Sequence, residues 1–260
     1  MIRTLFIIAG AALVLATACI AGALALGGVD LRGNGWSFVV HEDDDGEHTF
    51  VRRGEPAGDL GPDIVRTEAF TGGEALELAL SADVTYIQGP AATVVITGPK
   101  SVIDRVRLDG SRLSLDNGPD RVTVRLEDGG LHASTDAERL RIVVTAPSVN
   151  LFDVESSSDL SIRGYDQDMM SLDISGSGEV TAAGRTRALM LDISGSGEAH
   201  LGGLATTDAT VDISGSGEAR IAPTGAASVS ISGSGDVDLA TRPTTLRQDI
   251  SGSGQVDELG

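Results

Sequence analysis

The chain has 260 residues, of which 19 are Lys or Arg and 38 are Asp or Glu, so its formal net charge is −19. Such an acidic body repels phosphate groups, which argues against direct binding of nucleic acid and against a polybasic contact with anionic lipid. Aromatic residues make up only 3% of the chain, so small and branched aliphatic side chains must form most of the core. The single cysteine, Cys19, excludes an intramolecular disulfide framework.

The N-terminus carries an apolar segment, from Leu5 to Leu26, that contains no charged residue. About 20 such residues suffice to span a bilayer as a helix. Three interpretations stay open for residues 1–29: a cleaved secretory signal peptide, an uncleaved membrane anchor, or a lipoprotein signal with the lipid on Cys19. Each of them exports the rest of the chain, so we expect a periplasmic or cell-envelope location, with the membrane as a partner of this segment.

Residues 30–67 are rich in Gly, Asp and Glu and have few apolar positions, which predicts a linker. One hairpin is expected within it, formed by the segments WSFVV and HTFVR around an acidic turn. From residue 68 to about 150, short runs alternate between apolar and polar residues and are separated by turn signals such as Asp109–Gly110. This pattern predicts strands, and no amphipathic helix is expected after the N-terminal segment.

The rest of the chain, residues 151–260, is an internal repeat. The motif DISGSG or a close variant begins at Asp173, Asp192, Asp212, Ser230 and Asp249, and a degenerate copy begins at Asp153. The copies therefore follow one another every 18 to 20 residues. At about 3.3 Å per strand residue, each repeat traces roughly 60 Å, which suits one coil of a small β-solenoid with two or three short strands.

Stacking the coils about 4.8 Å apart aligns equivalent residues in columns. One inward aliphatic column is expected to contain Leu172, Leu191, Val211 and Val229, and another Ile174, Ile193, Ile213, Ile231 and Ile250. The repeated glycines, such as Gly195 and Gly215, suit a tight corner or a close backbone approach. The predicted fold is thus an all-β parallel β-helix with coils of 18 to 20 residues, right-handed like most parallel crossovers, after one N-terminal apolar helix.

This pattern resembles the head GIN domain family of bacterial auto-transporter adhesins, whose members carry repeated Ser-Gly-Ser-Gly motifs in β-helical coils. The resemblance covers about Glu68 to the end of the chain. It depends on the motif copies at Ser175, Ser194, Ser214, Ser232 and Ser251, on the stretch ELALSADVTYIQGPAATVVITGP from Glu77, and on RLSLDNG from Arg112. The resemblance implies an exported, all-β, β-helical domain. It supplies no agreed enzyme activity and no catalytic residues that could be assigned to this chain.

Two classes of function remain. The first is a non-enzymatic cell-envelope module that binds a glycan or an envelope protein, or acts as a structural spacer. The alternative is a carbohydrate-active β-helix enzyme acting on an envelope polysaccharide, with His200 and Arg220 as candidate charged groups in a groove. Because such residues sit at repeated positions, whereas an active site is usually singular, we expect the protein not to be an enzyme.

Acidic residues also form columns on the outer side of the coils, opposite the isoleucines. Asp173, Asp192 and Asp212 make one column, and Glu179, Glu198 and Glu218 make another. One interpretation is that these carboxylates fan into solvent and keep the protein soluble. The other is that the columns bind Ca²⁺ loosely, with the hydroxyls of Ser175, Ser194 and Ser214 as further oxygen donors; a melting temperature that rises with Ca²⁺ more than with NaCl of equal ionic strength would distinguish them.

The last repeat, from Asp249 to Gly260, has no evident cap. Its exposed strand edge is therefore a candidate for self-association.

Overall fold

The computed structural model describes residues 36–42, 48–53, 62–116, 120–127, 130–135, 139–155 and 157–258. The chain divides into two compact units, one made of Met1–Asp59 and Pro119–Asp136, the other of Leu60–Gly118 and Ala137–Gly260. The apolar segment Leu5–Leu26 lies outside the described residues, so the expected N-terminal helix stays a prediction. Within the described ranges, no helix is long and apolar enough to cross a membrane.

The first unit contains a four-stranded antiparallel sheet with the strand order β10-β9-β1-β2. The strands are β1 (Trp36–Glu42), β2 (His48–Arg53), β9 (Asp120–Glu127) and β10 (Gly130–Thr135). Residues Ser37–Glu42 of β1 pair antiparallel with all of β2, which is the hairpin that the sequence predicts. Strand β1 also pairs with β9, so two hairpins far apart in the chain share one sheet.

The second unit begins with short strands and one helical turn. These elements are β3 (Asp63–Ala69), β4 (Ala75–Ala79), β5 (Asp83–Gln88), β6 (Thr93–Pro99), α2 (Lys100–Ile103), β7 (Val106–Asp109), β8 (Arg112–Leu115), β11 (Arg141–Ala146) and β12 (Leu151–Val154). Strand β6 pairs antiparallel with both β3 and β11. Strands β4 and β12 pair in parallel, and β12 pairs in turn with the first long strand of the repeat, so this part leads directly into the solenoid.

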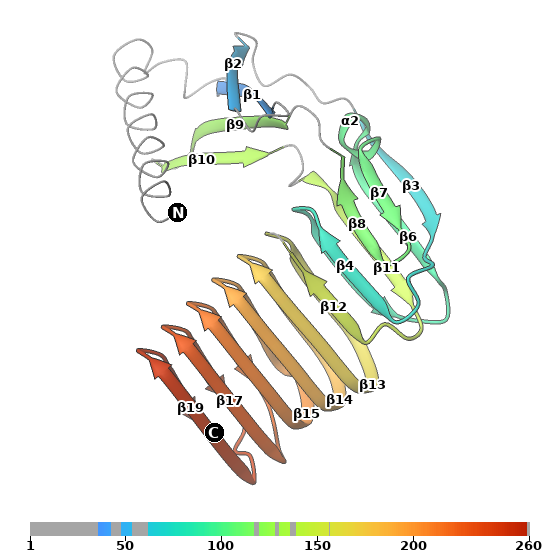
Figure 1. Ribbon diagram of the computed structural model, residues 1–260. Coiled ribbons are helices and arrows are strands. Elements are labelled where there is room, and N and C mark those ends of the chain that lie inside the picture. The colour runs from blue at the N-terminus through green and yellow to red at the C-terminus, as the bar shows by residue number, and fades with distance from the viewer. Residues whose placement is uncertain are drawn as a thin grey trace. The chain divides into compact units, whose positions relative to one another are not determined.

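The repeat forms a parallel β-solenoid of about five turns, which confirms the predicted fold class. Its strands are β13 (Asp159–Gly176), β14 (Glu179–Gly195), β15 (Glu198–Gly215), β16 (Glu218–Ile221), β17 (Ala226–Gly233), β18 (Asp236–Leu239), β19 (Thr245–Gly252) and β20 (Gln255–Glu258). Figure 1 shows β13, β14, β15, β17 and β19 side by side, from yellow to red. Three coils run as single strands of 17 or 18 residues instead of two or three short ones. The pairing of β13 with β14 and that of β14 with β15 each contain one register shift.

The predicted aliphatic columns form the core of the solenoid. Ile174, Ile193, Ile213 and Ile231 are each no more than 2% exposed, and so are Leu172, Leu191, Val211 and Val229. Ile250 stays in register with Ile231 but is 39% exposed, because no described coil follows it. At the other end of the repeat, the core is aromatic: the rings of Tyr86, Phe152 and Tyr165 are buried and meet edge to face.

The glycines of the repeated motif are required by the stacking itself. A Cβ atom on Gly215 would lie 2.3 Å from the carbonyl oxygen of Gly195 in the preceding coil, and its φ of +136° disfavours any other residue. The second glycine of the motif, Gly217, lies against the Cγ2 methyl of Ile193, 2.6 Å from where its own Cβ would be. The motif therefore makes a turn in which backbones and core side chains approach too closely for any side chain.

Candidate functional site

The acidic columns lie in register on the outer surface of the solenoid. Asp173, Asp192 and Asp212 are exposed and occupy equivalent positions on β13, β14 and β15. Each comes three residues before the end of its strand, at the turn made by the Ser-Gly-Ser-Gly motif. Glu179, Glu198 and Glu218 are also exposed and in register, and they begin the strands that follow the turn. The turn thus carries a column of carboxylates on each side.

Both columns extend further upstream than the repeat in the sequence. The register places Asp153 and Glu77 in line with Asp173. It likewise places Asp159 and Asp83 in line with Glu179. Sequence analysis missed this continuation because Glu77 and Asp83 lie outside the repeated motif. The alternating pattern around them, a carboxylate between two buried aliphatic residues, is the signal that could have revealed it.

Desolvation, and then the charges of neighbouring carboxylates, oppose the ionisation of these side chains. The pKa of Asp192 is raised above its ordinary value of 3.8, first by desolvation and then by the charges of Asp173 and Asp212. Desolvation is also the main cause of the raised pKa of Asp153, and the neighbouring Asp173, Glu155 and Glu77 raise it further. The carboxylates of each column therefore repel one another, and a positively charged partner would reduce this repulsion.

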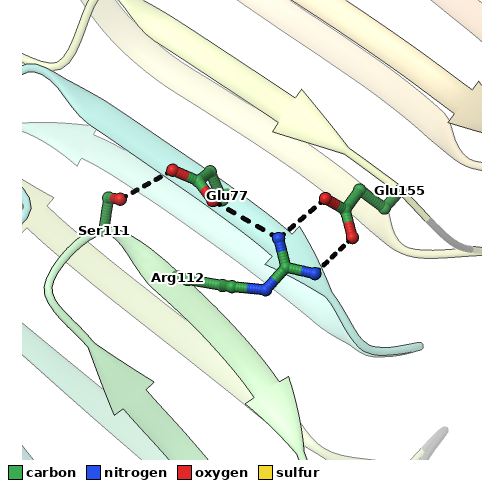
Figure 2. Close-up of polar contacts among 4 residues, drawn as sticks. All are labelled: Glu77, Ser111, Arg112 and Glu155. Carbon is green, nitrogen blue, oxygen red and sulfur yellow. Dashed lines mark hydrogen bonds and ion pairs between the residues drawn. The ribbon is translucent and has the colours of Figure 1, made fainter.

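Arg112 closes the first column at its upstream end, and Figure 2 shows its contacts. The guanidinium donates two hydrogen bonds to the carboxylate of Glu155, at 2.7 and 2.5 Å, and a longer one of 3.4 Å to Glu77. The Ser111 hydroxyl donates to the other oxygen of Glu77 at 2.8 Å. This pairing lowers the pKa of Glu155 below its ordinary value of 4.5. Arg112 therefore places a positive charge at this end of the first column. Further along, the described residues in register with Asp192 are Asp173 and Asp212, which are acidic.

The pH dependence of stability follows from these shifts. Because the pKa of Asp192 is higher in the folded protein, its contribution is fully present below the unfolded pKa and is lost as pH rises through the folded value. Glu155 has the opposite shift, so its contribution is lost as pH falls through its folded pKa. We expect Asp192→Asn to raise the melting temperature at pH 7 and to have no effect at about pH 3, below the ordinary pKa of aspartate.

Thermal melts of the wild type and this variant at constant ionic strength, from pH 7 to pH 3, measure the difference. Asp168→Asn is the matched control, because it removes one exposed carboxylate whose partner is Arg187, 3.7 Å away, instead of another carboxylate. An equal rise in melting temperature for both variants at pH 7 would mean that the net charge of the protein, and not the column, limits its stability.

A neighbouring column, two residues after the second one on each strand, carries more varied side chains. His200 lies next to Glu179 and Glu198, with its Nε2 atom 3.5 and 3.4 Å from their carboxylate oxygens. Arg220 occupies the equivalent position on the next coil, followed by Asp238 and Asp257. A cavity of about 260 Å³ lies over these residues and is lined by His200, Glu218, Ala219, Arg220, Asp236, Asp238 and Asp257. The structure therefore brings together His200 and Arg220, the two residues singled out from the sequence.

A larger hollow, of about 690 Å³, lies over the middle of the long strands β13, β14 and β15, away from the Ser-Gly-Ser-Gly turn. Its lining includes Arg185 and Arg187 together with threonines of three successive coils, Thr186, Thr206 and Thr224. The guanidinium of Arg185 donates to both carboxylate oxygens of Asp166, at 2.7 and 2.6 Å. These arginines are thus engaged with acidic neighbours on the preceding coil, Arg187 with Asp168.

No group of three or more His, Cys, Asp or Glu side chains in the described part of the chain is arranged to hold a metal ion. The loose Ca²⁺ binding expected for Asp173, Asp192, Asp212, Glu179, Glu198 and Glu218 stays a prediction.

The sequence profile of the family described as "Putative auto-transporter adhesin, head GIN domain" matches residues 74–243. This range contains the short strands from β4 onward and most of the solenoid. No curated protein matches the sequence.

Solved structures that are similar to this chain come from Bacteroides fragilis and from two species of Parabacteroides. A putative adhesin from Bacteroides fragilis has 16% identity and a TM-score of 0.53, and the alignment covers 76% of this chain and 97% of that protein. A putative lipid binding protein from Parabacteroides distasonis has 16% identity and a TM-score of 0.43, with 77% and 98% covered. A putative adhesin from Parabacteroides merdae has 15% identity and a TM-score of 0.42, with 77% and 97% covered. The first of these similarities shows a shared fold.

Proposed function

Because the chain belongs to the head GIN domain family of auto-transporter adhesins, we propose that it is a non-enzymatic binding module of the cell envelope. In this proposal the chain is exported, and the apolar segment Leu5–Leu26 either tethers it to the membrane or is removed. The description of the family and the 22 uncharged residues of that segment support an envelope location.

The observation that carries the proposal is the pair of exposed carboxylate columns in register over successive coils. Neighbouring coils are about 4.8 Å apart, so the columns present a regular row of negative charges on a rigid parallel sheet. A single exposed ion pair contributes little, typically under about 1 kcal/mol. A partner with several basic groups would contact several coils at once, and the weak contacts then add without further loss of freedom.

We therefore infer that the partner is an envelope protein with a basic surface. Such recognition has a clear signature, because contacts between exposed charges weaken as salt screens them. The residues that make the difference are Asp173, Asp192 and Asp212, which follow one another in the first column. Asp173 and Asp192 have carboxylates on both sides, whereas Asp212 is followed by Ser230.

The experiment compares three forms of the full chain in capture from envelope extract at low and physiological salt. The test variant carries Asp173→Asn, Asp192→Asn and Asp212→Asn. The control carries Asp109→Asn, Asp168→Asn and Asp257→Asn, which remove the same charge from three dispersed and exposed positions. We expect the test variant to capture at least about tenfold less partner than the wild type, and the control to capture nearly as much as the wild type. Equal losses would mean that capture depends on total charge alone, and the columns would not be the binding surface.

One observation favours a second candidate function. His200 and Arg220 line the same cavity of about 260 Å³ with Glu218, Asp236 and Asp238, which gives a base and charged groups in one hollow. A carbohydrate-active enzyme that used them would release reducing sugar from envelope polysaccharide, and His200→Ala would abolish this release. Absence of release by the wild-type protein would remove this candidate.

A further inference from the structure

The last coil ends the described stack with an edge that differs from every earlier coil. Strand β19 pairs with β17, and β20 pairs with β18; neither has a second partner among the described strands. In β19 the amides of Thr245 and Ser253, just beyond its end, donate to carbonyl oxygens of the preceding coil. Because peptide groups alternate in direction along an extended strand, those of Leu246, Gln248 and Ile250 face the open edge.

The inward side of this strand breaks the aliphatic pattern at one position. Gln248 is in register with Val229, which is 1% exposed, and so occupies a place where earlier coils carry leucine or valine. On either side of it, Leu246 is half-buried and Ile250 is 39% exposed, whereas the equivalent Ala227 and Ile231 are fully buried. The edge thus presents two apolar side chains around a central amide.

The outward side carries one charge of each sign, equally far from the same centre. Arg247 and Asp249 flank Gln248, and both are exposed. The segment Thr245–Ser251 therefore reads symmetrically around Gln248: hydroxyl, apolar, cation, amide, anion, apolar, hydroxyl. A second copy of the same strand, placed antiparallel, matches this segment at every position.

We propose that two copies of this protein associate through antiparallel pairing of their β19 strands, with Gln248 facing Gln248 of the second copy on a two-fold axis. In this register Arg247 of each copy lies opposite Asp249 of the other, as a pair that is not hydrogen-bonded and whose side chains are close. Leu246 and Ile250 of the two copies cover each other, and the two central amides donate to and accept from one another.

Charge also excludes the neighbouring registers. A shift of two residues in one direction centres the axis on Arg247 and opposes two guanidinium groups. A shift in the other direction centres it on Asp249 and opposes two carboxylates. Like charges directly opposite each other destabilise a strand pair. On the adjoining strand, Asp257 and Glu258 are exposed carboxylate residues, so pairing of two β20 strands is disfavoured. The surface is therefore specific for one isologous pair.

A charge exchange tests this interface in the full chain, purified in a nonionic detergent that keeps the apolar Leu5–Leu26 segment dispersed. Sedimentation velocity over a range of concentrations measures the dimer dissociation constant. Arg247→Asp places like charges opposite each other twice per dimer, so we expect the dissociation constant to rise at least about tenfold. Asp249→Arg should have the same effect. The double variant Arg247→Asp with Asp249→Arg restores both pairs and should return to within about threefold of the wild type.

A cross-link tests the register. In a Cys19→Ser background, Gln248→Cys places two thiols on the axis, where Cα atoms of a hydrogen-bonded pair lie about 5.5 Å apart, within the range of a disulfide. We expect mild oxidation to give a covalent dimer. Ser228→Cys, exposed on the preceding coil in register with Arg247, is the control and should stay monomeric. A monomeric wild type at about 100 µM, or a dimer that survives Arg247→Asp unchanged, would overturn the proposal, as would equal cross-linking from both positions.

Discussion

Ile213→Asp is expected to abolish folding of the solenoid at ordinary temperature. Ile213 is 2% exposed and lies between Ile193 and Ile231 in the aliphatic column. A carboxylate at this point has no hydrogen-bond partner and no counter-ion within the column, and such substitutions cost at least about 4 kcal/mol. Coils contact only their neighbours, so loss of one central coil separates the stack into two parts that each lack a stacking surface.

Circular dichroism and chemical denaturation measure the loss. Ser214→Asp is the matched control, because it adds the same charge at the next residue, which is exposed; we expect a change within about 1 kcal/mol. Ile213→Val keeps the apolar character and should cost about 1 kcal/mol. A cooperative wild-type transition in Ile213→Asp would show that the column is not the core of this coil.

Gly215→Ala is expected to destabilise the protein nearly as strongly, although it adds a single methyl group. The added Cβ would meet the carbonyl oxygen of Gly195 at 2.3 Å, and neither backbone can move away because both coils are hydrogen-bonded on each side. The positive φ of +136° adds strain of its own. We expect a loss of about 3 kcal/mol or more in the free energy of unfolding.

Gly202→Ala separates this effect from the general cost of replacing glycine. A Cβ on Gly202 would meet only the flexible side chain of Arg220, at 3.4 Å. Its stability should stay within about 1 kcal/mol of the wild type, or rise, because alanine has less freedom in the unfolded chain. If Gly215→Ala and Gly202→Ala both had the stability of the wild type, close stacking would not be the reason for the repeated glycines.

The sequence predicted the solenoid well because its signal is local and repeated. A motif of six residues returning every 18 to 20 positions fixes the period, and the period then fixes which residues stack. The columns of isoleucine, the glycine turn and the carboxylates of Asp173, Asp192 and Asp212 all followed from that register, and the structure places each of them where stacking requires.

The parts that escaped prediction depend on contacts between distant residues. Arg112 reaches Glu155, 43 positions away, and nothing in the pattern around either residue indicates the other. The pairing of β1 with β9 joins residues about 85 positions apart, so alternation alone could not separate residues 120–135 from their neighbours in the chain. The register of Gln248 with the buried Val229 was hidden for another reason, because a glutamine interrupts the aliphatic pattern from which inward-facing positions are recognised.

The direction of the backbone hydrogen bonds has a mechanical consequence. In a parallel solenoid the bonds between coils all run along the stacking axis. A force that pulls the last coil along this axis therefore loads the bonds of one coil at a time, and the coils detach in sequence instead of yielding together. Each detached coil of about 19 residues releases roughly 60 Å of chain. Under tension the protein would lengthen in regular steps while the coils behind the break stay intact. Each step would dissipate mechanical work before the contact between the protein and its binding partner fails.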